Sequence, residues 1–286
     1  MRIIKYFFQA ICLYLLLIIF KILGYKLASD FGSKIGNFFG PLFRNKKIVS
    51  LNIKKALPHI SDKDEKTLTK NMWSNYGRML GEYIHLKSFR NLKLKKHLLI
   101  KGEEILRNIS QNSEQVIFIS GHFNNFELMA MQIETAKIKL ATIYRPLNNI
   151  FLNKFMEKIR TNYICKKQIK KGIGGTRELL KLYKQGYSIA LMIDQRVSEG
   201  VKSIFFNNEA LTTTIPAQLI KKFNCKVVPI YIERINKSDF ILSIDNPINF
   251  IEDETTEKIT NDLNKILEKM VLKNPDQWIW SHNRWK

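Results

Sequence analysis

The sequence predicts an α/β fold, with a mixed, largely parallel central sheet flanked by helices and an N-terminal membrane-anchor helix in front of it. Three observations lead to this prediction. Short apolar, β-branched runs of strand length alternate with stretches of helical periodicity along most of the 286 residues. Two of these runs, residues 116–119 and 140–144, are separated by one apolar helical stretch, which is the spacing of a parallel strand–helix–strand unit. An apolar stretch at residues 3–23 precedes them.

The N-terminal stretch is the one membrane candidate in the sequence. Residues 6–20 carry no charge, and these 15 residues fall short of the ~20 that a spanning helix needs, but Lys5 and Lys21 can extend toward the two interfaces. The alternative is an amphipathic helix at the membrane interface or a helix of the core. Basic residues are more frequent after the stretch than before it, so the positive-inside rule predicts that the rest of the chain faces the cytoplasm. We expect a membrane anchor at residues 1–24 and one larger domain at residues 25–286.

The composition is strongly basic. Lys and Arg number 47 against 25 Asp and Glu, a formal net charge of +22, which favours an anionic partner such as an acidic membrane surface, an acidic protein or a nucleic acid. No RNA- or DNA-binding signature is present, so we expect no nucleic-acid partner. The cysteines Cys12, Cys165 and Cys225 are far apart and form no Cys-x-x-Cys pair, so we expect neither a disulfide framework nor a zinc site.

The remaining elements follow in order along the chain. Residues 25–60 contain several glycines and basic residues, and we interpret them as a basic bridge between the anchor and the domain. Ser61 caps a long helix that reaches about residue 85. The later runs predict strands at 98–100, 188–193, 225–232 and 240–244 and helices at 103–108 and 257–272.

The candidate catalytic residues follow directly after the run 116–119, in the segment that contains Gly121 and His122. Asn124 is a good helix N-cap, and Glu127 follows it by three positions, like the acidic residue of a capping box. His122 then lies beside the positive end of a helix, which disfavours the imidazolium and keeps the ring neutral, as a general base must be. The carboxylate of Glu127 accepts from one ring nitrogen and fixes the tautomer. The alternative is a turn histidine without chemistry and a glutamate that only caps its helix.

Polar side chains also follow two other predicted strands. Arg145 comes directly after the second strand of the parallel unit, and a third strand is followed by Asp194, Gln195 and Arg196. The carboxyl ends of parallel strands border the crevice in which open α/β sheets bind ligands, so we expect these side chains near His122. The alternative for Arg145 is a surface cation.

These residues resemble a known family. Gly121-His122, four further residues and Glu127 resemble the His-x4-Asp/Glu block of the glycerolipid and lysophospholipid acyltransferases, and the Asn-Asn-Phe-Glu ending is similar to the lipid A lauroyl/myristoyl acyltransferase branch of that superfamily. The chain departs from the pattern at Asn125, where a small residue is expected, and at Phe126, where Trp is frequent. Four more blocks stand in the family's order: residues 44–58, Tyr-Arg-Pro-Leu-Asn-Asn at 144–149, Asp-Gln at 194–195 and Trp-x-x-x-His-x-Arg-Trp-Lys at 278–286.

The resemblance implies an enzyme that transfers a fatty acyl chain from an acyl-carrier-protein thioester to a hydroxyl of a lipid A precursor or a related anionic glycolipid, at the bacterial inner (cytoplasmic) membrane. His122 is then the general base and Glu127 the residue that orients it. No cofactor and no metal is implied, and the aromatic C-terminal tail is expected to dock on the domain. The residues expected to bind the oxyanion or the substrate are Gly121, Asn124, Asn125, Arg145, Asp194, Gln195 and Arg196.

Two alternatives stay open. One is a phospholipid acyltransferase that uses acyl-CoA. The other is a non-catalytic, membrane-tethered module that binds anions or nucleic acid. Such a module explains the net charge of +22 equally well, but it does not explain a histidine and a glutamate at a strand–helix junction.

Overall fold

A seven-stranded sheet runs through the centre of the protein, for which a computed structural model describes residues 2–251 and 253–286. Met1, the first residue of the expected anchor, and Glu252 lie outside the described residues. The strands of this sheet are β1 (Leu98–Lys101), β2 (Val116–Ser120), β3 (Leu140–Tyr144), β4 (Lys167–Lys170), β5 (Ser188–Met192), β8 (Lys226–Ile235) and β9 (Asp239–Ile244), and a separate hairpin is formed by β6 (Val201–Phe205) and β7 (Asn208–Thr212).

The helices complete the fold on both sides of this sheet. The α-helices are α1 (Arg2–Phe43), α2 (Lys46–Ala56), α3 (Asp62–Tyr83), α4 (Leu86–Arg90), α5 (Glu103–Gln111), α6 (Glu127–Thr135), α7 (Ile150–Ile159), α8 (Ile173–Lys184), α9 (Ile215–Phe223) and α10 (Thr256–Lys273). The short helices are the 3-10 turns η1 (Lys95–His97) and η3 (Pro275–Gln277) and the π-helical turn η2 (Arg160–Ile164).

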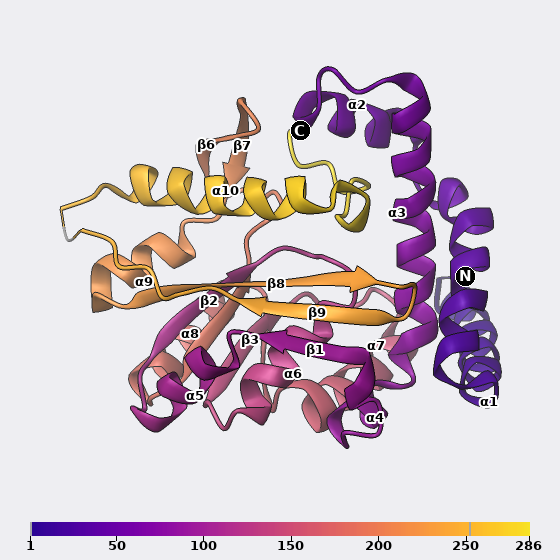
Figure 1. Ribbon diagram of the computed structural model, residues 1–286, viewed down its shortest axis with the longest axis horizontal. Helices are drawn as coiled ribbons and strands as arrows, with labels where there is room; N and C mark the ends of the chain where they lie inside the picture. Colours follow the sequence, from indigo (N-terminus) through magenta and orange to yellow (C-terminus); the bar gives the residue numbers. More distant parts are fainter. Residues whose placement is uncertain (1, 252) are drawn as a thin grey trace.

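The strand order is β1-β9-β8-β2-β5-β3-β4. All its pairings are parallel except the antiparallel pair β8–β9, so the predicted mixed, largely parallel sheet is confirmed. The hairpin and α10 lie over one face of the sheet, and α4, α5, α6 and α7 lie over the other (Figure 1). The side chains of the central strand β2 are all buried. Because β2, β3 and β5 run parallel, the loops that follow them meet at one edge of the sheet.

Strand β4 was not expected from the sequence. It lies at the edge of the sheet, and three of its four residues are polar, Lys167, Gln168 and Lys170. Only Ile169 is buried in the core. A polar edge strand with one inward apolar residue lacks the β-branched run by which the other strands were recognised.

Helix α1 consists of two helical halves that meet at a kink. Gly24 at the kink has φ 73° and ψ 170°, a conformation that favours glycine. The second half lies along α3 with the two backbones in contact, because a Cβ placed on Gly77 would be 1.9 Å from the carbonyl oxygen of Gly32. Residues 25–43, expected as part of a basic bridge, are therefore a packed helix. The glycines of this segment let the two helices touch.

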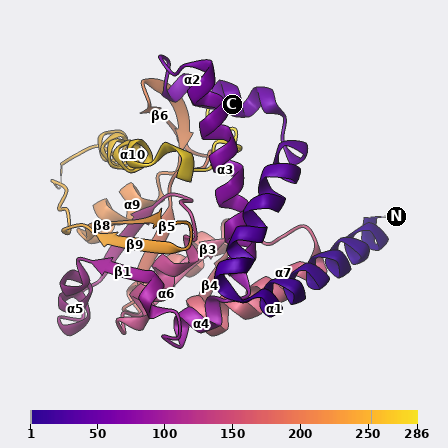
Figure 2. The ribbon, with the colours of Figure 1, turned by 45° about the vertical axis from the view of Figure 1, so that its right-hand side comes forward.

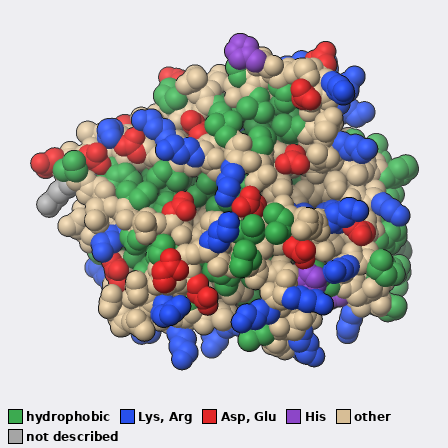
Figure 3. Space-filling view, in the orientation of Figure 1, with side chains coloured by type: hydrophobic (Ala, Val, Ile, Leu, Met, Phe, Trp, Pro, Cys, Tyr) green, Lys and Arg blue, Asp and Glu red, His purple; other side chains and the backbone are tan. Residues whose placement is uncertain are grey.

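The first half of α1 is largely exposed. It contacts α7 along one side, where the hydroxyl of Tyr14 donates to the carbonyl oxygen of Phe151 at 3.0 Å. Figure 2 shows this half extending away from the sheet, and apolar side chains gather on the side of the molecule that α1 occupies in Figure 3. By length and composition α1 can cross a membrane, and it is a candidate anchor. Its exposed large apolar residues before the kink are Ile3, Ile4, Phe7, Phe8, Ile11, Leu15, Ile18, Ile19 and Ile22.

We predict that Gly77→Ala destabilises the protein by about 1–3 kcal/mol, because the added methyl group collides with the backbone of α1 and forces the two helices apart. Thermal unfolding in detergent measures the loss. Gly174→Ala is the matched control, since Gly174 lies in helix α8 with no atom within 4 Å of an added Cβ. There the substitution should be neutral or slightly stabilising. Equal melting temperatures for the two variants would contradict the close packing of α1 on α3.

Candidate active site

His122 lies on the loop that directly follows β2, and its partner is Asp194, which follows β5. The imidazole Nδ1 is 2.8 Å from one carboxylate oxygen of Asp194, and the backbone N–H of His122 donates to the other oxygen at 2.8 Å. The indole Nε1 of Trp278 donates to that second oxygen at 2.9 Å. Because an ionised carboxylate only accepts, Nδ1 of His122 carries the proton and Nε2 is left free to accept another.

The carboxylate of Asp194 sets the protonation of His122. Asp194 is 0% exposed, and although burial alone would raise its pKa, the charge of His122 and the three donors hold that pKa below its usual range. Burial would likewise lower the pKa of His122, but the charge of Asp194 and the hydrogen bond to it raise that pKa above its ordinary value. The sequence analysis expected a helix dipole to favour the neutral ring, whereas in the structure a buried anion favours the charged one.

Gly121 makes room for the hydrogen bond between His122 and Asp194. A Cβ at Gly121 would lie 2.9 Å from the ring of Phe123 and 3.2 Å from Cβ of Asp194. A larger residue at this position would therefore push Asp194 away from His122. Gly121 thus leaves the space that its neighbours need, and its expected contact with the oxyanion or the substrate stays a prediction.

The expected contact between Glu127 and His122 is corrected by the structure. Helix α6 begins at Glu127 rather than after Asn124, and Asn124 has φ 43°, so no capping box forms. The carboxylate of Glu127 instead accepts from Nε of Arg160 at 2.8 Å in a buried ion pair. The physical reason is that the left-handed turn at Asn124 directs the start of α6 toward η2, while Asp194 on the neighbouring strand already occupies Nδ1 of His122.

Arg160 was missed by the sequence analysis. It begins the π-helical turn η2 and lines the same cavity as His122. Its Nε and Nη2 donate to Glu127, its guanidinium also lies beside the hydroxyl of Tyr83, and the side chain borders the cavity. The π-helical turn that directs Arg160 inward has no signature in the sequence, although such turns are frequent at functional sites.

Two amides fix the loop after β2. Asn125 donates to the carboxylate of Glu82 at 3.2 Å, and Glu82 is buried in an ion pair with Arg234. Asn124 donates to the side-chain oxygen of Gln277 at 2.6 Å. Asn124 is 4% exposed and Asn125 is 0% exposed, so both hold the loop from within the protein. The structure thus shows a positioning role for both asparagines, and their expected contact with the oxyanion or the substrate stays a prediction.

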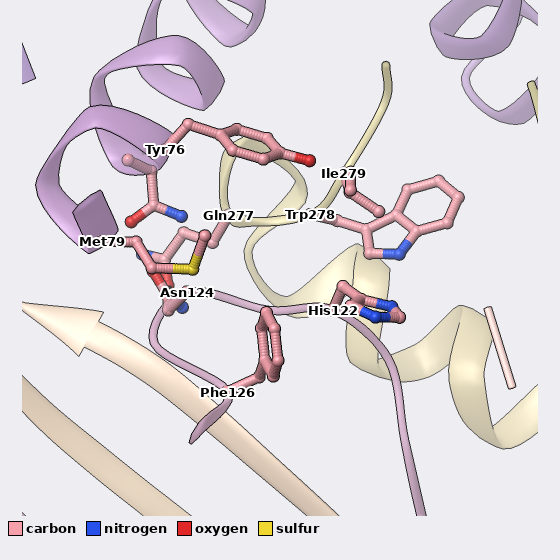
Figure 4. Close-up of a pocket in the computed structure, with 9 residues that line it drawn as sticks. Tyr76, Met79, His122, Asn124, Phe126, Gln277, Trp278 and Ile279 are labelled. Carbon is pink, nitrogen blue, oxygen red and sulfur yellow. Dashed lines mark hydrogen bonds between the residues drawn. The ribbon is translucent and has the colours of Figure 1, made fainter. Parts of the chain in front are cut away.

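A small pocket of about 20 Å³ lies on one side of His122, between α3 and the C-terminal tail. Figure 4 shows the ring of His122 beside the indole of Trp278, with Tyr76 and Met79 of α3 across the pocket. The ring of Phe126 contacts His122 edge to face, with centroids 5.0 Å apart. Protein atoms thus pack closely against the imidazole on this side.

A large cavity of about 690 Å³ lies on the other side of His122. One part of its wall is apolar and comes from α6, β3, α7 and η2, with Met129, Ala130, Ile133, Ile143, Met156 and Ile164. The polar part includes Arg145, Arg160, Lys171, Gln195, Arg196 and His282. Of the residues expected at the site, His122, Glu127, Arg145, Gln195 and Arg196 line this cavity, whereas Asp194 reaches it only through His122. Arg145 is exposed at the rim.

Among the described residues, no group of three or more His, Cys, Asp or Glu side chains is placed to hold a metal ion.

Comparisons with known proteins give a consistent result. A family model described as "Bacterial lipid A biosynthesis acyltransferase" matches residues 1–286. The chain is 24% identical over 275 residues to the lipid A biosynthesis palmitoleoyltransferase of Escherichia coli (strain K12), covering 92% of this chain and 86% of that protein. It is 22% identical over 253 residues to lipid A biosynthesis acyltransferase 2 of Shigella flexneri, covering 87% of this chain and 80% of that protein.

Two further matches complete the comparison. The lipid A biosynthesis lauroyltransferase of Escherichia coli (strain K12) is 22% identical over 253 residues, covering 85% of this chain and 79% of that protein. Among solved structures, the 1-acyl-sn-glycerophosphate acyltransferase PlsC from Thermotoga maritima superimposes with a TM-score of 0.43 at 13% identity, covering 90% of this chain and 100% of that chain.

We predict that Asp194→Asn lowers the pKa of His122 below its ordinary value, because burial then acts on the imidazolium without a compensating charge. An NMR titration of the histidine ring measures this pKa. Glu127→Gln is the matched control, since it removes one negative charge that does not bond His122, and it should shift the pKa much less. A larger shift in Glu127→Gln than in Asp194→Asn would restore Glu127 as the partner of the histidine.

Proposed function

The chain belongs to the bacterial lipid A biosynthesis acyltransferase family, and we propose that it transfers a fatty acyl chain from an acyl-carrier-protein thioester to a hydroxyl of a lipid A precursor. Members of this family are O-acyltransferases, so the chain is an enzyme, and the non-catalytic binding module is excluded. The observation that carries the proposed site is the hydrogen bond of 2.8 Å between His122 and Asp194 at the wall of the large cavity.

In this proposal His122 is the general base and Asp194 the residue that orients it. Nε2 of His122 takes the proton of the acceptor hydroxyl while the hydroxyl oxygen attacks the thioester carbon. Asp194 stabilises the imidazolium that forms. When the tetrahedral intermediate collapses, the carbon–sulfur bond breaks and His122 returns the proton to the sulfur, which leaves an ester and a free thiol. No covalent acyl-enzyme takes part.

Arg160 is the residue that we assign to the oxyanion. The negative charge that develops on the thioester oxygen is best stabilised by a donor that is already fixed in place and partly shielded from water. The buried ion pair with Glu127 supports this role, because it holds the guanidinium at the cavity. Glu127 is then a positioning residue that acts through Arg160. Arg145, exposed at the rim, is better suited to bind an anionic group of the acceptor than the oxyanion.

The large cavity suits an acyl chain and a charged headgroup together. Its apolar wall between α6 and α7 offers a path for the acyl chain that starts at His122. Lys171 and Arg196 at its polar part offer cations for phosphate groups of the acceptor. The net charge of +22 supports two acidic partners, the carrier protein and a phosphorylated glycolipid, more directly than a neutral acceptor.

Lipid A acyltransferases are associated with membranes in bacteria, and this chain carries an apolar N-terminal helix. We assign the anchor to the part of α1 before the kink at Gly24, with the catalytic domain on the cytoplasmic side of the inner membrane. Two observations support this assignment: the exposed apolar side chains before the kink and the excess of basic residues after it.

We predict that His122→Ala lowers acyl transfer by about 10²–10⁴-fold without loss of the fold, because a general base contributes that much and the ring faces a cavity. Mass spectrometry of a lipid A precursor incubated with the full-length protein and an acyl-carrier-protein thioester measures the product. His59→Ala, at an exposed histidine, is the control and should transfer at the wild-type rate. Parallel assays with an acyl-CoA thioester test the donor.

Two outcomes would contradict the proposal. Near-full turnover by folded His122→Ala protein would remove His122 from the mechanism. Transfer from acyl-CoA that is faster than transfer from the carrier protein, with a lysophospholipid as the preferred acceptor, would favour the phospholipid acyltransferase instead.

We also predict that Ala130→Phe shifts the preference of the enzyme toward shorter acyl chains. The larger side chain fills part of the apolar wall near α6, so the end of a long chain no longer fits, while His122 stays unchanged. Competition between thioesters of different chain length, read out by mass spectrometry, measures the preference. Ala130→Ser, which keeps the volume nearly constant, is the control. An unchanged preference in Ala130→Phe would place the acyl chain elsewhere.

A further inference from the structure

A second histidine lines the large cavity together with His122. His282 lies on the C-terminal tail, and its Nε2 is 2.9 Å from the backbone nitrogen of Arg196. A backbone N–H can only donate, so Nε2 of His282 is the acceptor. The neutral ring must then carry its single proton on Nδ1. The hydrogen bond to Arg196 thereby fixes the tautomer of His282, just as Asp194 fixes that of His122.

The tail holds His282 firmly in place. The side-chain amide of Asn52, on α2, donates to the carbonyl oxygens of Trp280 at 2.8 Å and of His282 at 2.7 Å. Two residues further on, Arg284 is 0% exposed and donates to the carbonyl oxygen of Leu211 at 2.8 Å. These bonds hold the backbone of the tail, and the bond from the backbone of Arg196 orients the ring.

His282 therefore presents one unused donor. Within residues 2–251 and 253–286, its Nδ1 has no hydrogen-bond partner. Burial lowers the pKa of His282, so the ring is neutral near pH 7 and keeps this single N–H group. A neutral donor of fixed direction at the wall of a substrate cavity is suited to a substrate oxygen.

The two histidines line the same cavity but come from different parts of the chain, the loop after β2 and the C-terminal tail. Asp194 is hydrogen-bonded to His122, and the backbone of Arg196 is hydrogen-bonded to His282. Because Asp194 and Arg196 are two residues apart, their Cα atoms are at most about 7 Å apart even in an extended chain. Much of the apolar wall belongs to α6 and α7, which lie below the sheet in Figure 1, whereas the tail lies above it beside α2 and α10. An acyl chain held by the apolar wall leaves the tail side of His122 to the acceptor.

We propose that Nδ1–H of His282 donates to the oxygen of the acceptor hydroxyl while Nε2 of His122 accepts the proton of that hydroxyl. A hydroxyl has one hydrogen and two lone pairs, so two imidazoles fix its rotation and leave one lone pair to attack the thioester. The assignment rests on the proposed function, because it requires a hydroxyl acceptor. Water in the same place depends less on a fixed donor, since it offers either of two hydrogens to His122.

The test compares three forms of the full-length protein: wild type, His282→Met and His282→Gln. Met keeps the volume but removes the donor, whereas Gln retains an acceptor for Arg196 and a donor for the cavity. Each form is assayed with a lauroyl thioester, with and without a lipid A precursor. We expect His282→Met to lower transfer to the glycolipid about tenfold, the size of one hydrogen bond, and to leave thioester hydrolysis within about threefold of wild type. His282→Gln should recover most of the transfer.

Three results would overturn the assignment. Equal losses of hydrolysis and transfer in His282→Met would show that the ring acts on the thioester or through Asp194. Unchanged transfer in His282→Met, or no recovery in His282→Gln, would show that no donor is needed. A wild-type protein that hydrolyses the thioester but never acylates the glycolipid would overturn the proposed function, and this assignment with it.

An independent measurement addresses the tautomer without any assay of activity. Nitrogen-15 NMR of histidine-labelled protein, with His282→Gln to assign the signal, reports which ring nitrogen carries the proton. We expect protonated Nδ1 and unprotonated Nε2 for His282 near pH 7. A proton on Nε2 would overturn the assignment even if a variant failed to fold.

Discussion

The carboxylate of Asp194 is the interaction on which the rest of the site depends. Its two oxygens accept from the ring of His122, the backbone of His122 and the indole of Trp278, and the side chain is 0% exposed. A buried carboxylate is costly unless it is fully hydrogen-bonded and close to a positive charge. Asp194 meets both conditions only when the loop after β2, the loop after β5 and the C-terminal tail come together. Removing any one of these partners leaves the buried charge with fewer donors, so the three segments stabilise one another through it.

Other buried polar groups near Asp194 are also hydrogen-bonded to distant parts of the chain. The loop after β2 contains two asparagines, which are held by Glu82 on α3 and Gln277 on the tail. Glu82 also accepts from Ser29 of α1 at 2.7 Å and is paired with Arg234 of β8. The donors of both asparagines thus have partners from distant parts of the chain, whereas the side-chain oxygens of Asn124 and Asn125 have none within residues 2–251 and 253–286. These contacts hold the loop after β2 from several sides, and a fixed loop suits the general base that we propose for His122.

The sequence was sufficient for features that depend on local pattern. The buried strands β2, β3, β5 and β8 are β-branched and apolar, and His122, Gln195 and Arg196 follow such strands, so their approach to one cavity was predictable from the parallel arrangement. The hydrogen-bond partner of His122 was not predictable from the sequence. Glu127 has the spacing of a capping box, but the positive φ of Asn124 overrides that local preference, and Asp194 reaches the ring across the sheet. The position of Arg160 depends on a π-helical turn, and the helix at residues 25–43 depends on the close packing of its glycines against α3. Neither effect can be recognised from the periodicity of apolar residues.

The dependence of Asp194 on Trp278 also has a consequence for the order of events during synthesis. Trp278 follows Asp194 by 84 residues, so a ribosome that adds about 5–20 residues per second needs roughly 4–17 s between them. Helix α1 emerges long before either residue and can meet the membrane while the carboxylate still lacks its third donor. The site around His122 is therefore completed only when the C-terminal tail has been made. Under the proposed function, a half-made chain therefore lacks a completed site for the acyl donor.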